Sequence, residues 1–134
     1  MKRIALLILA LALVAAVPAI GANKVRLAGC GDKPSYKPKK VIIACGDGAF
    51  VVIKLEWSKW SRKTAIGSGI AKVNTCEPNC AEGKFKSYGV KLTAGKPTQC
   101  GKGDRQFIRL TYTFTGKKPK GVKRTESVPR PCNG

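Results

Sequence analysis

Histidine is missing from this 134-residue chain, which removes most of the catalytic chemistry open to a small protein. Serine and cysteine triads and most general-base mechanisms use a histidine that titrates near neutral pH. Carboxylates remain, and seven follow residue 22: Asp32, Asp47, Glu56, Glu77, Glu82, Asp104 and Glu126. Their spacing favours no acid–base pair of the kind that cleaves glycosides. We therefore expect no catalytic residue and no cofactor, and a small secreted hydrolase ranks third among the possible functions.

Cysteine is the other residue type with distinctive chemistry. The six cysteines are Cys30, Cys45, Cys76, Cys80, Cys100 and Cys132. Their even number predicts three disulfides in an oxidising compartment. The alternative is a zinc site, but the pair at 76 and 80 has no matching second pair and no histidine to complete it. For the pairing we expect Cys30 with Cys132, which would join the two ends of the domain, and Cys45 with the Cys76–Cys80 loop.

The charge is strongly positive, with 26 Lys and Arg against seven Asp and Glu, a formal net charge of +19. Excluding Lys2 and Arg3 lowers this value to +17. Such a surface attracts polyanions through counterion release. We therefore expect a monomeric, non-catalytic protein whose partners are anionic polymers of the cell envelope or other polyanions. A solvated lysine-rich surface without a ligand is the simpler alternative, and a protein-interaction or inhibitor module presenting a loop such as 77–82 is the second-ranked function.

Two tryptophans stand among basic residues. Trp57 continues an apolar alternation and is expected in the core, whereas Trp60 would point the opposite way if the strand persists. An exposed indole beside lysine can stack on sugars or bases, but β domains of this size usually build their cores around aromatics, which favours both rings covering the interior. The candidate binding surface consists of Trp60, Lys59, Arg62, Lys63, Lys117, Lys118, Lys120, Lys123 and Arg124.

The first 22 residues have the pattern of a signal peptide. Lys2 and Arg3 precede an apolar run over 4–17, and small residues follow over 18–22. The run is too short for a membrane span, so we expect a secreted protein. The alternative is a lipid anchor at Cys30, because Leu27-Ala28-Gly29-Cys30 has the form of a lipobox, although charges at Lys24 and Arg26 weaken it.

β-type alternation dominates the remaining chain and predicts strands over 41–45, 50–57, 65–73, 88–94 and 106–115. In the second strand, alternate residues from Val51 to Trp57 should share one face. In the fifth, Ile108, Leu110, Tyr112 and Phe114 should do so. Gly67 and Gly69 suit a strand against which a ring or another backbone packs closely. The fold class expected is all-β, a small antiparallel β-sandwich or barrel-like domain of five or six strands, stapled by disulfides.

Turn residues complete this organisation. Residues 46–48, Gly-Asp-Gly, predict a hairpin turn in which Asp47 is a turn residue rather than a calcium ligand. The lysine- and proline-rich stretches 33–40 and 117–123 should be extended and solvated. The domains expected are a signal peptide (1–22), an extended basic N-terminal segment (23–40) and a disulfide-bonded β domain with a basic C-terminal tail (41–134).

The chain also resembles a family of small secreted actinobacterial proteins. The residues that carry the resemblance are Cys30, Lys33-Pro34, Lys37-Pro38, Ala44-Cys45-Gly46-Asp47-Gly48, Trp57-Ser58-Lys59-Trp60, Ala65-x-Gly67-x-Gly69, Asn74-x-Cys76-x-Pro78-x-Cys80-Ala81-x-Gly83-Lys84-Phe85, Cys100, Phe107-x-Arg109-Leu110, Pro119 and Cys132. The resemblance implies a structural thiol at Cys30, in agreement with three disulfides. It implies no activity.

Overall fold

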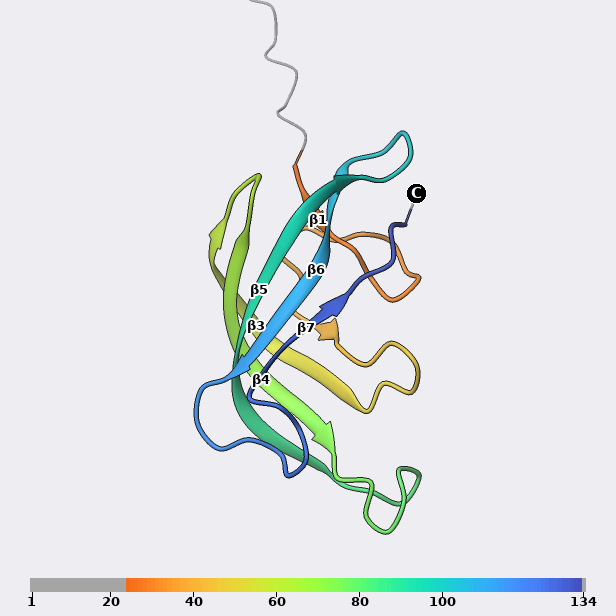
Figure 1. The fold of residues 1–134 in the computed structure, drawn as a ribbon, viewed down its shortest axis with the longest axis vertical. Helices are drawn as coiled ribbons and strands as arrows, with labels where there is room; N and C mark the ends of the chain where they lie inside the picture. Colours follow the sequence, from red (N-terminus) through yellow and green to blue (C-terminus); the bar gives the residue numbers. More distant parts are fainter. Residues whose placement is uncertain (1–23, 134) are drawn as a thin grey trace, which may run out of the picture.

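The computed structural model describes residues 24–133, so the predicted signal peptide lies outside the described residues. The fold of this part is all-β, as predicted (Figure 1). Its strands are β1 (Arg26–Leu27), β2 (Val41–Ile42), β3 (Phe50–Trp60), β4 (Ala65–Asn74), β5 (Phe85–Gln99), β6 (Arg105–Phe114) and β7 (Thr125–Pro129). Across residues 24–133, no helix is long and apolar enough to span a membrane.

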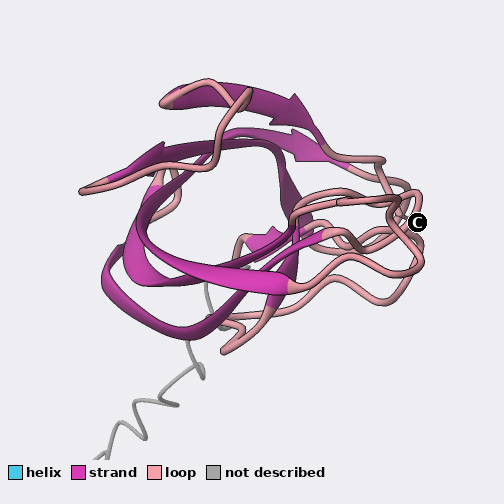
Figure 2. Ribbon diagram, turned by 90° about the horizontal axis from the view of Figure 1, so that it is seen from below, coloured by secondary structure: helices cyan, strands magenta, loops and turns pink. Residues whose placement is uncertain are grey.

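The strands form one curled sheet in the order β1-β6-β5-β4-β3-β2, and β7 is a further neighbour of β6. The pairs are antiparallel except for β1 with β6, which is parallel. Seen end on, the long strands curve around a central core and make a half-barrel (Figure 2). Leu92, Leu110 and Phe114 line its inner face and are almost completely buried.

Residues 35–40 bridge the open side of the half-barrel. Ser35 exchanges two backbone hydrogen bonds with Leu27 of β1, at 2.8 and 3.0 Å, and the amide of Leu55 in β3 donates to the carbonyl of Lys39 at 3.1 Å. Val25 and Leu27 are buried in the core. The core thus extends upstream of the predicted domain boundary at residue 41, and the segment predicted to be extended closes the fold instead.

An irregularity in β3 changes which side chains face the core. The pairing with β4 shifts register around Lys54, whose φ is +53°. Val52 and Leu55 are both completely buried, whereas Val51 and Ile53 are half-buried. The predicted face is therefore wrong for Val51 and Ile53, because a bulge moves the alternation by one residue.

A second departure from alternation occurs in β6. Leu110, Tyr112 and Phe114 are buried as predicted. The alternation also predicts that Ile108 is buried, but Ile108 is only half-buried and its neighbour Phe107 is buried instead. The change lies opposite Lys96 of β5, whose φ is +53°. A left-handed residue twists the strand locally, so the side chains on either side of it do not keep one alternation.

The close approach predicted at the glycines of β4 is confirmed. A Cβ at Gly67 would lie 2.8 Å from Cε3 of Trp57 and 2.9 Å from the carbonyl oxygen of Glu56. At Gly69 it would lie 2.8 Å from the carbonyl oxygen of Ile53. Both positions face the irregular strand β3, so the missing side chains leave room for its bulges.

The hairpin predicted at residues 46–48 is also confirmed. The loop joins the antiparallel strands β2 and β3, and Gly48 has φ +67°. Asp47 accepts a hydrogen bond at 2.9 Å from the amide of Ala49, the contact of an Asx turn. Its carboxylate therefore stabilises the turn.

All six cysteines form disulfides, which confirms the predicted number. The pairs are Cys30–Cys45, Cys76–Cys80 and Cys100–Cys132. Both predicted pairings are wrong. A sulfur of Cys30 that is bonded to Cys45 is not available for acylation, so this geometry supports a structural thiol rather than the lipobox interpretation.

The observed pairing follows from a strand that the sequence did not indicate. β7 runs antiparallel to β6, and the amide of Arg130 continues the ladder to the carbonyl of Ile108 at 2.8 Å. The chain end therefore returns to the start of β6, where Cys100 follows β5. Cys30 follows β1 and faces Cys45 beyond the edge strand β2, with 5.2 Å between their Cα atoms. The Cys76–Cys80 loop joins β4 to β5 and closes on itself.

We expect Gly67→Ala to lower the free energy of unfolding by about 2 kcal/mol, because the new methyl group must displace the Trp57 ring or the Glu56 carbonyl. Gly95→Ala in β5 is the matched control, since a Cβ there meets nothing within 4 Å. Urea denaturation of both variants measures the difference. Equal losses would show that the close approach does not constrain the sheet.

The three disulfides should differ in their contribution to stability. Their loops do not overlap, and the separations of the paired cysteines are 32 residues for Cys100–Cys132 and four for Cys76–Cys80. Replacing the first pair by alanines should cost about 4 kcal/mol and replacing the second about 2 kcal/mol, because longer loops lose more entropy on closure. Denaturant titration tests the order, and a larger loss for the short loop would contradict it.

Candidate functional site

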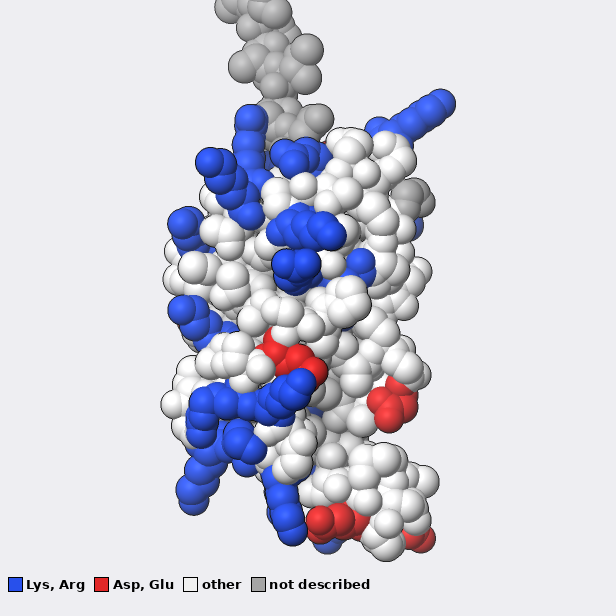
Figure 3. Space-filling model, in the orientation of Figure 1, with Lys and Arg blue, Asp and Glu red and all other residues white. Residues whose placement is uncertain are grey.

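A strip of exposed basic side chains crosses the outer face of β5 and β6. Cross-strand pairing of Gly95 with Arg109 places Lys96 beside Arg109, and Lys91 points outward between two buried residues of β5. All three basic side chains are exposed. We call Lys91, Lys96 and Arg109 the basic strip. Figure 3 shows basic side chains over β5 and β6 and down to the β6–β7 loop, whereas the few acidic ones lie in the lower half of the view.

Hydroxyl groups lie between these cations. Thr93 pairs across strands with Thr111, whose hydroxyl is 2.7 Å from that of Ser127, and Thr125 donates to Thr113 at 3.1 Å. Hydroxyls both donate and accept hydrogen bonds. This row of hydroxyls can therefore form hydrogen bonds to the oxygens of a phosphate, carboxylate or sugar. The neighbouring cations would neutralise the negative charge of such a ligand.

A shallow hollow accompanies the strip. It has a volume of about 320 Å³, and Lys96, Arg109, Ile108 and Pro129 are among the residues that line it. Its lining combines the half-buried apolar side chain of Ile108 with the exposed cations of Lys96 and Arg109. Such a combination can hold the backbone of a polymer and contact its charged groups at the same time.

Little of the positive charge is neutralised within the protein. Residues 24–133 contain two ion pairs, Arg26 with Asp104 at 2.7 Å and Lys123 with Glu126 at 3.7 Å. Glu126 also accepts a hydrogen bond at 2.7 Å from the hydroxyl of Tyr112. Burial, together with this bond and the charge of Glu126, raises the pKa of Tyr112 above its ordinary value. The basic strip itself has no carboxylate partner among the described residues.

The sequence-predicted binding residues fall into two groups. Lys59, Trp60, Arg62 and Lys63 lie at the β3–β4 hairpin. Ala65, the first residue of β4, pairs with Ala94 of β5. The others belong to the β6–β7 loop, which begins beyond Phe114 at the other end of the sheet (Figure 1). The structure does not bring the two groups together.

Two of the loop residues have a structural task. Lys118 donates to the carbonyl of Val122 at 2.8 Å, and Arg124 donates to the carbonyls of Phe114 and Gly116 at 3.0 and 2.9 Å. These contacts hold the loop against the end of β6. Lys123 forms the ion pair with Glu126, so Lys117 and Lys120 are the exposed cations of the loop without a hydrogen bond or ion pair among the described residues.

Trp60 is part of an aromatic cluster. Its ring contacts Trp57 at 4.7 Å and Phe107 at 5.8 Å between centroids, and its Nε1 donates to the carbonyl of Val25 at 2.9 Å. The expectation that the two tryptophans point in opposite directions is wrong, because β3 shifts register a second time between Trp57 and Lys59. Both rings cover the interior, which was the alternative interpretation.

The exposed aromatic ring at this end belongs to Tyr36. It is 40% exposed and contacts Trp60 at 5.2 Å between centroids. The ammonium groups of Lys24 and Lys37 lie 5.2 and 5.6 Å from its centroid, within the range of cation–π attraction. The combination of an aromatic platform and lysines that the sequence suggested at Trp60 therefore occurs at Tyr36.

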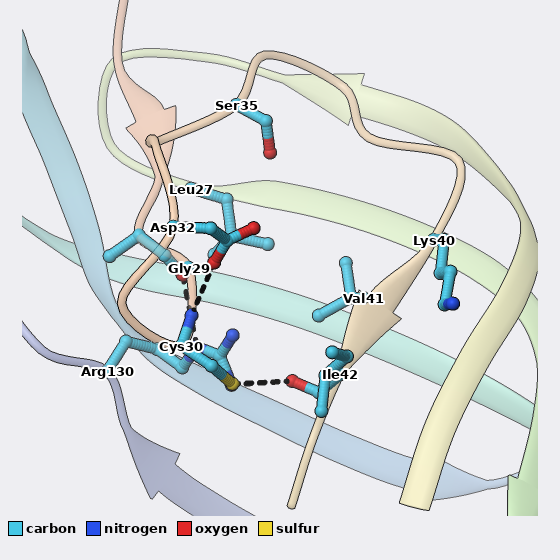
Figure 4. A pocket seen from close by; sticks show the side chains of 10 residues that line it. Leu27, Gly29, Cys30, Asp32, Ser35, Lys40, Val41, Ile42 and Arg130 are labelled. Carbon is cyan, nitrogen blue, oxygen red and sulfur yellow. Dashed lines mark hydrogen bonds between the residues drawn. The ribbon is translucent and has the colours of Figure 1, made fainter. Parts of the chain in front are cut away.

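A separate pocket of about 250 Å³ lies between the loop after β1 and strand β2 (Figure 4). Arg130 lines it and is only 5% exposed. Its Nε donates to the carbonyl of Ala28 at 3.1 Å and its Nη1 to the carbonyl of Ile42 at 2.7 Å. Burial lowers the pKa of this guanidinium, and the charge of Asp32 acts in the opposite direction.

Sequence reasoning missed Lys91, Lys96, Arg109 and Arg130. Alternation already placed Lys91 and Arg109 on an outer face, but only the register of β5 with β6 shows that Lys96 lies beside Arg109. Nothing in the sequence around Arg130 distinguishes it from the other basic residues of the C-terminal segment. No three Cys, His, Asp or Glu side chains gather as a metal site within residues 24–133.

Comparisons with protein-family models, with curated proteins and with solved structures find no match to the chain.

We expect Trp60→Ala to lower the free energy of unfolding by about 2–4 kcal/mol, because it removes a packed ring and a hydrogen bond. Tyr36→Ala is the control at the same end and should cost less, since its ring is more exposed. Thermal denaturation followed by calorimetry compares the two. A loss of less than about 0.5 kcal/mol for Trp60→Ala would contradict this prediction, because that is the loss expected for an exposed surface ring.

Proposed function

We propose that the mature protein is a secreted, non-catalytic binding protein that associates with anionic polymers of the cell envelope or with other polyanions. The observation that carries this proposal is the uncompensated positive charge on the outer face of the sheet. There the basic strip lies beside a row of hydroxyls, and carboxylates are few.

The chemistry of this face suits a repeating anionic polymer better than a compact protein partner. Cations from neighbouring strands can each replace a counterion of the polymer, and the hydroxyls between them can bond to its oxygens. The face offers no large apolar patch of the kind that forms the core of a protein interface. Among the described residues, the exposed large apolar side chains are Tyr36, Ile42 and Phe85, which lie on different elements.

The three disulfides and the predicted signal peptide support an extracellular location, because disulfides persist in oxidising compartments. Phosphate- and carboxylate-bearing wall polymers are the anions that a protein meets there. A surface with this charge would collect on them at low ionic strength and be released as salt rises.

The test uses a triple variant, Lys91→Gln, Lys96→Gln and Arg109→Gln, on immobilised heparin and on isolated cell wall across a salt series. We expect earlier elution and a salt slope smaller by about 2, since each lost contact with a flexible polyanion removes roughly 0.7 from the slope. The control removes the same charge elsewhere, with Lys33→Gln, Lys39→Gln and Lys84→Gln, and should change elution less.

Equal effects of the two triple variants would show that net charge alone governs retention and that the basic strip is no site. Retention that resists salt would point to a packed protein interface and therefore to the interaction or inhibitor module.

A further inference from the structure

The pocket at Arg130 is distinct from the basic strip and lies on the side of the half-barrel that residues 35–40 close. A guanidinium buried to this extent is normally paired with a carboxylate, since desolvating a cation is costly. Residues 24–133 provide no ion-pair partner for it. Its hydrogen bonds, to the carbonyls of Ala28 and Ile42 and to the sulfur of Cys45, are to neutral groups, and the charge of Asp32 acts on it without forming an ion pair.

The second terminal nitrogen of Arg130, Nη2, has no hydrogen-bond partner among the described residues. Every completely buried side-chain polar atom in this part of the chain has a partner. Nη2 is therefore not completely buried, and the spaces that Arg130 adjoins are this pocket and the hollow beside the basic strip. The carbonyls of Ala28 and Ile42 fix the plane of the group, so two N–H donors are held in place before any ligand arrives.

The other charged residues of the pocket are Lys40 and Asp32. Figure 4 shows them on opposite sides of Val41. Asp32 uses Oδ1 to accept the amide of Cys30 at 2.8 Å, which stabilises the loop. One acid against two cations leaves a positive site, and Leu27 and Val41 add an apolar wall.

We propose that this pocket binds a single oxyanion group, a carboxylate or phosphate monoester with a short apolar stem. Arg130 keeps its charge, and the N–H donors of Nη2 remain for an oxyanion, since Nε and Nη1 already donate to Ala28, Ile42 and Cys45. Lys40 supplies the second positive charge, and the volume of about 250 Å³ admits a small group rather than a folded polymer. Lys91, Lys96 and Arg109 do not line this pocket, although Arg130 also lines the hollow beside the basic strip, so the variants below are chosen to separate the two sites.

The experiment titrates the full mature protein with inorganic phosphate and, separately, with isovalerate, and follows amide and arginine Nε–H resonances by NMR. We expect saturable shifts at Gly29, Cys30, Ile42 and the Arg130 side chain. The two ligands separate the sources of the oxyanion: tighter binding of isovalerate indicates a carboxylate with an apolar stem, and tighter binding of phosphate indicates a phosphate ester.

Three variants locate the site. Arg130→Lys should weaken binding about tenfold or more, because a single ammonium cannot both replace the bonds to Ala28 and Ile42 and hold N–H donors in place for the ligand. Lys40→Gln should weaken it severalfold, and Ser35→Phe should block it by filling the pocket while leaving the backbone bonds of Ser35 to Leu27 in place. Arg105→Lys is the control, because Arg105 is exposed and does not line this pocket.

Lys40→Gln and Ser35→Phe keep the test decisive if Arg130→Lys does not fold. Unchanged affinity in both, an absence of saturation up to molar ligand, or shifts confined to surface lysines would each overturn the proposal. The triple variant of the basic strip should lose polymer binding and keep these shifts, so failure of either proposal can be told from failure of the other.

Discussion

The half-barrel depends on one clamp at its open side, the buried guanidinium of Arg130. It joins three segments that are distant in sequence, because it belongs to the residues after β7 and bonds to the carbonyls that follow β1 and end β2. An arginine can do this because it keeps its charge and offers several donors in a fixed plane. The same arrangement that closes the fold also leaves a cation facing a pocket.

Two of the three disulfides act on this closure rather than on the sheet. Cys30–Cys45 fixes the loop after β1 beside β2, and Cys100–Cys132 fixes the segment after β7 beside the turn from β5 to β6. Neither joins the two ends of the domain to each other, which was the arrangement expected from the sequence. Strands β3 to β6 have long ladders and a continuous core to hold them. The closing strands β1, β2 and β7 have ladders of only two, two and five residues, so they are where cross-links add most.

The fold class and the long strands could be predicted because period-two alternation survives over most of β4, β5 and β6. β1 and β7 could not, since two and five residues are too few to show a period. The faces of β3 were misassigned because bulges depend on what packs opposite, and Gly67 and Gly69, which make room for them, belong to another strand. Prediction of the candidate site met the same limit. The residue types indicated that cations would carry the binding, but the cross-strand register decides which cations are neighbours.

The positions of the charges reconcile a formal excess of +17 with a folded sheet. Among the described residues, Arg130 is the one buried cation, and the lysines of the strands point outward, where water and salt reduce their repulsion within about 8–10 Å. Burial of the apolar side chains on the inner face therefore does not have to offset the desolvation cost of many buried charges. Repulsion that remains on the outer face falls when a polyanion replaces the mobile counterions, so the feature that weakens the isolated fold is the one that favours a charged partner.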